Sequence, residues 1–348
     1  MKGKFSYPVI LIILTVLFIG FGCFVYLFPW ETVLVGVLEP DIDENQEDDD
    51  GEIDEVLPFI CPFDGTPLEE LPLRPVVVTI DNFAPARPQS GLSAADLIYE
   101  IPAEGGITRF LAIYYHGQAE KIGPIRSARP YLALLAQDWH GVYIHAGESP
   151  QAQIFFKQEG LDHINEMFHP QGFWRDKNRK APHNLYSSSE SLWKEIVKKG
   201  WNEETHIDQF TFLSEGEELP GGADASQITI KYPYSNVVFK KDSGSGLYRR
   251  FLGDQPQIDK ETGAQLTASN IIVQEVPIRV FDSEGRLEMD LVGEGKAWLF
   301  SGGRVVAGRW VKDEGKRTRY IDAKGNEFFL NPGQTWIEIV SKSNKIEY

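Results

Sequence analysis

Charged side chains gather between residues 74 and 186, at positions that the sequence pattern places in turns between apolar runs. Such turns usually present the binding and catalytic groups of a protein. Three acids here are candidate catalytic residues, because glycoside hydrolysis uses two carboxyl groups that flank the bond to be broken. The same acids could instead form ion pairs with nearby arginines, and the sequence alone leaves both interpretations open. The three candidates are Asp81, Glu100 and Glu104.

Two arginines stand in the segment Gly123-Pro-Ile-Arg-Ser-Ala-Arg-Pro130, just before a predicted helix. The start of a helix is the positive end of its dipole, so two cations there are mildly unfavourable, and a bound anion or an acidic partner would offset this cost. Arginines beside the free N–H groups of a helix start suit a carboxylate or a phosphate. We therefore predict an anion site formed by Arg109, Arg126 and Arg129, with internal pairing to Glu100 or Glu104 as the equal alternative.

Three ring-bearing side chains complete the predicted ligand site. His145 ends a short apolar run, where an imidazole can donate, accept or titrate, although a hydrogen-bonded core histidine fits the same pattern. Trp174 and His183 lie in a stretch that mixes aromatic and basic residues, which suits a sugar ring carrying an anionic group. Ser149 resembles a nucleophile elbow only in part, because the second glycine is missing, and Ser149-Pro150 is more simply a helix N-cap.

No metal site and no cofactor are predicted. His163, His169 and His183 lack tight ligand spacing, and no HExxH motif occurs. Cys61 has no cysteine partner beyond the predicted membrane segment, so neither a disulfide nor a cysteine zinc site is expected. Nucleic acid is an improbable partner for an acidic, exported chain.

The N-terminus predicts a membrane anchor. After a cytoplasmic segment 1–7 that contains two lysines, residues 8–28 carry no charge, and at about 1.5 Å per residue they span roughly 30 Å. We predict one transmembrane helix over 8–30 with the rest of the chain outside, since lysines precede the span and acids follow it. A cleaved signal peptide is the alternative. Cys23 is a candidate lipidation site whose preceding residues fit a lipid box poorly.

The linker that follows, residues 31–71, is predicted to be disordered. Residues 39–55 contain eleven acids and no base, which supplies most of the net charge of −17. Such a run is too polar and too self-repelling to fold, so it is interpreted as a spacer between the membrane and the folded part. A weak calcium-binding role is the alternative, because clustered carboxylates suit hard cations.

The remaining chain predicts an α+β fold. Strand-like runs such as 75–80 alternate with helical patterns over 128–139, 149–160 and 187–200. After residue 214 the pattern changes to short β-prone runs separated by glycine-containing turns. We therefore predict a mixed α/β domain over 72–214 and a mainly β domain over 225–348.

Several motifs lie along the folded part of the chain: Arg74-Pro-Val-Val-Val, Glu104-Gly-Gly-Ile-Thr-Arg109, Ile122-Gly-Pro-Ile-Arg-Ser-Ala-Arg129, Ala181-Pro-His-Asn-Leu-Tyr186 and Asn331-Pro-Gly-Gln-Thr-Trp336. Together they resemble the YerB-like envelope lipoprotein family, a domain of unknown function (number 3048) with N- and C-terminal parts. The resemblance covers nearly the whole chain after residue 60 and departs at the lipid box. It implies two linked domains and an envelope location, and it brings no established activity.

The sequence thus predicts a single-pass protein of the cell membrane whose folded part is extracytoplasmic. Its expected function is to bind an anionic, cell-wall-derived ligand or an envelope protein through an Arg/His/carboxylate cleft in the first domain. A cell-wall glycan hydrolase or lyase is the alternative, and a purely structural scaffold is the third hypothesis.

Overall fold

The computed structural model describes residues 59–214 and 216–348. The predicted cytoplasmic segment, the membrane span, Cys23 and the acidic run 39–55 lie outside the described residues. Within the described ranges, no helix is both long and apolar enough to cross a membrane.

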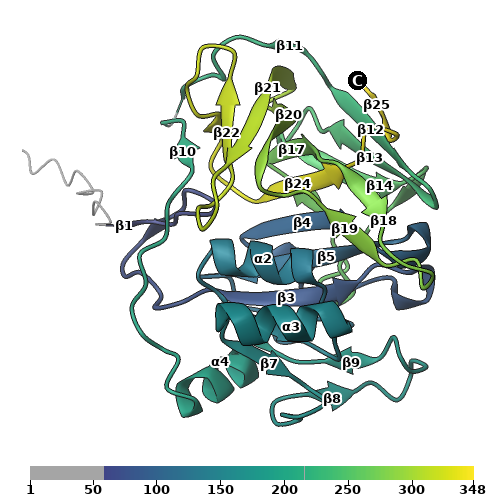
Figure 1. Ribbon diagram of the computed structural model, residues 1–348. Coiled ribbons are helices and arrows are strands. Elements are labelled where there is room, and N and C mark those ends of the chain that lie inside the picture. Colours follow the sequence, from purple (N-terminus) through teal and green to yellow (C-terminus); the bar gives the residue numbers. More distant parts are fainter. Residues whose placement is uncertain (1–58, 215) are drawn as a thin grey trace, which may run out of the picture. The chain divides into compact units, whose positions relative to one another are not determined.

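A mixed sheet of eleven strands forms the centre of the described chain (Figure 1). The order of its strands is β11-β21-β20-β17-β24-β4-β5-β3-β6-β7, and β22 pairs with β21 at one side. In that order the strands are β11 Ala223–Asp224, β21 Arg304–Lys312, β20 Gly293–Ser301, β17 Asn270–Glu275, β24 Thr335–Val340, β4 Leu97–Pro102, β5 Thr108–Tyr114, β3 Val76–Asp81, β6 Val142–His145 and β7 His163–Asn165, with β22 at Arg319–Asp322.

This sheet runs through both predicted domains, because β24 pairs in parallel with β4. A second, six-stranded sheet packs on the same core. It contains β15 Gln255–Pro256, β14 Tyr248–Leu252, β13 Ser235–Lys241, β12 Gln227–Tyr232 and β25 Lys345–Glu347, with β16 Thr267–Ala268 beside β14. Four two-stranded pairs complete the β structure: β1 Phe59–Ile60 with β2 Pro67–Leu68, β10 Thr211–Phe212 with β23 Phe329–Leu330, β18 Ile278–Val280 with β19 Leu287–Met289, and β8 Trp174–Arg175 with β9 Leu185–Tyr186.

Three α-helices lie within the described ranges, and they cover both faces of the β3–β6 part of the sheet (Figure 1). A separate hydrophobic core lies on each face of the sheet, because alternate residues of a strand point to opposite faces. Val77 packs with α2 on one face, whereas Val76 and Val78 pack with α4 on the other. The helices are α2 Pro130–Asp138, α3 Pro150–Glu159 and α4 Ser189–Lys198.

The predicted helices are therefore confirmed, and the fold is a mixed α/β structure with mostly β content. The start of α3 is built as expected, since Ser149 Oγ accepts a hydrogen bond of 3.2 Å from Ala152 N. Gly160 ends this helix in the left-handed conformation, at φ +65°.

Candidate functional site

Most of the predicted site residues meet at one edge of the large sheet. Strands β3, β6 and β7 are parallel, so their carboxyl ends, Asp81, His145 and Asn165, lie at the same edge. Strand β5 runs the other way and places Arg109 opposite Asp81. The carboxyl edge of parallel strands is where α/β sheets usually bind ligands.

The segment 126–129 lies along this edge and is held by backbone hydrogen bonds on both sides. Arg126 N donates to Thr79 O over 2.9 Å, and Ala146 N donates to Arg126 O over 3.0 Å. Ala128 N then donates to Gly147 O over 2.9 Å. Strand β3 and the β6–α3 loop thus fix both arginines of the segment at the edge.

Glu104 lies between two arginines. Its Oε2 is 3.2 Å from Arg109 Nη2, and its Oε1 accepts a hydrogen bond from Arg129 Nε. Burial alone would raise the pKa of Glu104, but the hydrogen bond from Arg129 and the charges of both arginines lower it. Glu104 is therefore ionised, and the cluster retains one positive charge.

Arg109 is almost fully buried, which is costly for a guanidinium. Its Nη1 donates to Ser127 O over 3.1 Å, but no hydrogen bond is made by its buried Nε within the described residues. Burial and the adjacent charge of Arg129 lower the pKa of Arg109. A buried guanidinium thus lies beside a second one, and its Nε makes no hydrogen bond in the described part of the chain.

Asp81 forms a second cluster next to the first. Its Oδ2 lies 2.6 Å from His183 Nδ1 and 3.1 Å from Arg126 Nε. The geometry at Arg126 gives an ion pair without a hydrogen bond, so this buried Nε is a second donor without an acceptor in the described chain. Asp81 is 1% exposed, whereas the side chain of His183 is 15% exposed.

Glu100 lies apart from this edge cluster of arginines. Its side chain is fully buried and pairs with Arg250 from the six-stranded sheet, which also binds Glu338 Oε1 over 2.8 Å. Asn82 Nδ2 and Thr108 Oγ1 donate to Glu100 Oε1 over 3.0 and 2.5 Å. Every close polar partner of Glu100 is thus inside the protein.

His145 is also buried, as the core-histidine interpretation expected. Its Nδ1 lies 2.9 Å from Gly147 O and its Nε2 lies 2.9 Å from His163 Nδ1. Burial lowers the pKa of His145 to about 3, so the ring is neutral at ordinary pH. Trp174 lies elsewhere, on β8 opposite Tyr186, and is 39% exposed.

Two of the cavities in the described chain are lined in part by α-helices, and sequence reasoning identified neither. One of about 350 Å³ is lined by Arg129, Tyr131, Phe155 and Met289, between the starts of α2 and α3 and the β18–β19 hairpin. Of its lining residues, the sequence singled out Arg129 as a ligand residue and Ser149 as a helix N-cap, and most of the others are ordinary positions of helices and turns.

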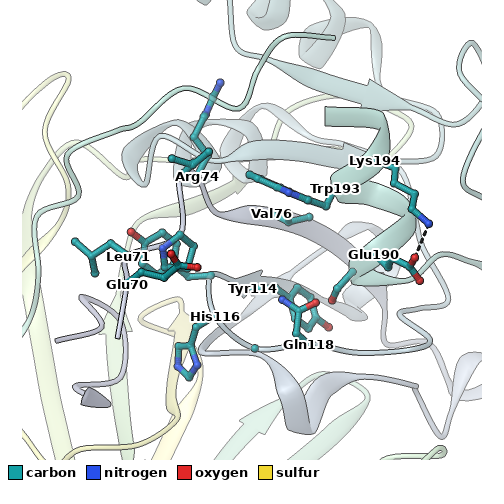
Figure 2. Close-up of a pocket in the computed structure, with 15 residues that line it drawn as sticks. Glu70, Leu71, Arg74, Val76, Tyr114, His116, Gln118, Glu190, Trp193 and Lys194 are labelled. Atoms are coloured by element: carbon teal, nitrogen blue, oxygen red, sulfur yellow. Dashed lines mark hydrogen bonds and ion pairs between the residues drawn. The ribbon is translucent and has the colours of Figure 1, made fainter. Parts of the chain in front are cut away.

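The other cavity, of about 770 Å³, lies between the 70–74 segment, the end of β5 and α4 (Figure 2). Figure 2 shows Trp193 and Tyr114 beside it and His116 at its border. His116 Nε2 lies 3.0 Å from Asp64 Oδ2 and 2.9 Å from Asp96 Oδ1. Hydrogen bonds to these carboxylates raise the pKa of His116 to about 12.

This ion network predicts a pH-dependent contribution to stability. The pKa of His116 is higher in the folded than in the unfolded state, so its contribution is full below about pH 6.5 and declines as pH rises toward 12. We expect His116→Gln to lower the free energy of unfolding most at pH 6 and progressively less at pH 8 and 10. Urea unfolding of both proteins at each pH measures this difference, and a gap that grows with pH would contradict the assignment.

Comparisons with known proteins agree with the resemblance. Residues 65–202 match the family model "Protein of unknown function (DUF3048) N-terminal domain", and residues 228–337 match the corresponding C-terminal domain. The chain is 34% identical over 272 residues to "Putative lipoprotein YerB" of Bacillus subtilis, covering 77% of this chain and 81% of that protein.

A solved structure is also similar. The crystal structure of the YerB protein from Bacillus subtilis superposes with a TM-score of 0.75 at 31% sequence identity, covering 83% of this chain and all of that one. The chain therefore belongs to the DUF3048 family of proteins of unknown function.

Proposed function

We propose that this chain is an extracytoplasmic envelope protein that binds an anionic, cell-wall-derived ligand at the Arg109/Arg126/Arg129 edge of its large sheet. The similarity to a protein named as a lipoprotein supports the envelope location. Attachment by the predicted helix 8–30, with the folded part outside, belongs to the same proposal.

The observation that carries ligand binding is a pair of buried donors that make no hydrogen bond within the described residues, Arg109 Nε and Arg126 Nε, the second of which still forms an ion pair with Asp81. Buried polar groups almost always have a hydrogen-bond partner, and exceptions call for an explanation such as a bound ligand or water. Three arginines face only two carboxylates, Glu104 and Asp81, so an anion would also balance the charge.

The surroundings favour a ligand that is partly apolar. Arg129 borders the cavity of about 350 Å³, whose other lining residues include Tyr131, Leu134 and Phe155. A carboxylate or phosphate held by the arginines could thus place an attached apolar group in this cavity. His183, with its partly exposed ring, would lie beside the anion through Asp81. Trp174 lies on a separate hairpin, so we leave it out of the proposed contact.

Peptidoglycan binding tests the proposal. We expect the full-length chain in mild detergent to co-sediment with purified peptidoglycan. Arg126→Ala should weaken this binding by about tenfold or more, since a hydrogen bond to a charged group contributes about 1.5–3 kcal/mol. Arg309→Ala is the matched control, because Arg309 lies on β21 and forms an exposed ion pair with Glu294 on β20. Equal binding by Arg126→Ala and wild type would reject the site.

The same samples test the hydrolase or lyase alternative. One observation favours it, the Asp81–His183 pair, which could act as an acid–base unit. Glu100 and Glu104 are weaker candidates than their sequence positions indicated, because arginines hold both. Fragments released by wild type and lost in His183→Ala would establish catalysis in place of simple binding.

A further inference from the structure

We infer that His145, Glu148 and His163 form a binding site for a divalent transition-metal ion, with zinc as the best-suited ion. The three residues come from the end of β6, the loop before α3 and the start of β7. One ligand atom from each lies within 4.8 Å of the other two. Their spacing in the sequence matches no metal motif, so only the pairing of β6 with β7 brings them together.

The distances suit a tetrahedral ion. Zinc–nitrogen and zinc–oxygen bonds of about 2.0–2.2 Å place neighbouring ligand atoms about 3.4 Å apart. His145 Nε2 lies 2.9 Å from His163 Nδ1 and 3.9 Å from Glu148 Oε2. These separations bracket the required value, so side-chain shifts of about half an ångström would complete the geometry.

The hydrogen bonds of His145 fix its protonation. Gly147 O can only accept, so His145 Nδ1 must carry the proton that makes their 2.9 Å contact. In the neutral ring Nε2 then holds a lone pair directed at His163. Metal-binding histidines typically donate their other N–H to a carbonyl or carboxylate in this way. His145 is therefore oriented as a ligand before any ion binds.

His163 can change tautomer to complete the site. Without an ion, its Nδ1–H donates to His145 Nε2. An ion at the site would take the Nδ1 lone pair, and the proton would reside on His163 Nε2. The ring stacks on Phe156 with centroids 3.9 Å apart, which fixes its plane in either form.

Glu148 supplies the negative charge, and its carboxylate is also positioned. Asn165 Nδ2 donates to Glu148 Oε2 over 2.9 Å, while Asn165 Oδ1 accepts from Gly147 N over 3.0 Å. Asn165 thus ties the carboxylate to the loop that orients His145. Two imidazoles and one carboxylate suit zinc, and three protein ligands leave a fourth position for water or an anion.

A second group, Cys61, Asp64 and His116, also gathers possible ligand atoms. There the imidazole is already paired with two carboxylates, Asp64 and Asp96, and each is satisfied without an ion. At the other group, no lysine or arginine pairs with Glu148 within the described residues, and its neighbour His145 is neutral. The His145 group is therefore the better site.

Metal titration of the full-length chain in detergent tests the inference. After chelator treatment and dialysis, Zn²⁺ is titrated by calorimetry, and Co²⁺ is added as a visible-absorption probe. We expect one ion per chain. Loss of a residue that only hydrogen-bonds a metal ligand typically lowers metal affinity about 10–100-fold. Glu148→Gln and His163→Ala remove proposed ligands, so each should lower zinc affinity by more than that. Both side chains are partly exposed. Glu148→Gln leaves the His163 ring in place, so it separates loss of a ligand from loss of the stacking that His163→Ala removes.

His206→Ala is the matched control, because His206 has a side-chain exposure of 90% and lies outside the group. The His206→Ala variant should bind zinc as tightly as wild type. Arg126→Ala, which alters the proposed anion site, should also bind zinc as tightly as wild type, so the two proposals can fail independently. Absence of zinc binding by wild type would overturn the inference. Retained affinity in Glu148→Gln and His163→Ala, or loss only in Cys61→Ser with a thiolate band in the Co²⁺ spectrum, would do the same.

Discussion

Replacing Arg250 with methionine will lower the free energy of unfolding by about 3–5 kcal/mol at neutral pH, the cost of breaking a buried ion pair. Arg250 is fully buried between Glu100 and Glu338, which lie opposite each other on β4 and β24. The guanidinium also makes a cation–π contact with Trp336, at 4.3 Å from the ring centroid; methionine loses this contact but fills much of the same space. Two carboxylates would remain in the core without a cation. Urea unfolding measures the loss.

Arg249→Met is the matched control, one residue earlier on the same strand. Arg249 is half exposed and pairs with Asp242 at the surface, so its removal should cost about 0–1 kcal/mol. Burial and the charge of Glu100 raise the pKa of Glu338 despite Arg250. Arg250→Met with Glu338→Gln should therefore recover part of the stability. A loss no larger than that of Arg249→Met would show that the Arg250 cluster is not desolvated.

Lys312→Met should have a comparable effect that depends on pH. Lys312 is buried at the end of β21, where its Nζ contacts Asp138 Oδ1 at the end of α2 and the backbone oxygen of Lys316. Burial raises the pKa of Asp138 to about 7, with Lys312 as the opposing influence. Without the lysine, an ionised Asp138 would stay buried and unpaired, which costs about 3–5 kcal/mol.

The sign follows from proton binding. A carboxyl group whose pKa is higher in the folded state favours folding at low pH, and this contribution is lost as pH rises through about 7. Removing Lys312 raises that pKa further, so we expect a large loss of stability at pH 8 and a smaller one at pH 5. Unfolding measured at both values checks this. Lys316→Met, which keeps the backbone oxygen and changes an exposed side chain, should be nearly neutral at both.

Local features could be read from the sequence because they depend on neighbouring residues alone. Ser149-Pro150 begins α3 and Gly160 ends it, as capping preferences predict. The apolar run after Pro75 is a buried strand, and the chain after residue 214 is mostly β. The motif combination also indicated the family correctly, since it needed only the order of residues.

The partners of the charged groups could not be read in this way. Glu100 and Glu104 were equal candidate partners for the arginines at the helix start. Glu104 does pair with Arg129, but Glu100 pairs with an arginine 150 positions away, through a contact between two sheets. His145 and His163 meet only because β6 and β7 pair in parallel. Spacing within one helix or strand is set by local geometry, whereas contacts between strands depend on the order of the sheet, which no short segment encodes.

The sequence by itself therefore determined the three α-helices, strands such as β3, and which part of the chain collects arginines, histidines and acids. The prediction was wrong for residues 59–68, which were expected to be disordered linker but form the β1–β2 pair. Only the tertiary structure decided which of these charged and polar groups contact one another. It buried Glu100 with Arg250 and Glu338, and it brought His145, Glu148 and His163 together. Within the described residues, it also left the Nε atoms of Arg109 and Arg126 without a hydrogen bond. The physical reason is the cost of burying charge, because a buried ion is stable only with a partner. Which residue becomes that partner depends on how the strands and sheets pack in the complete fold.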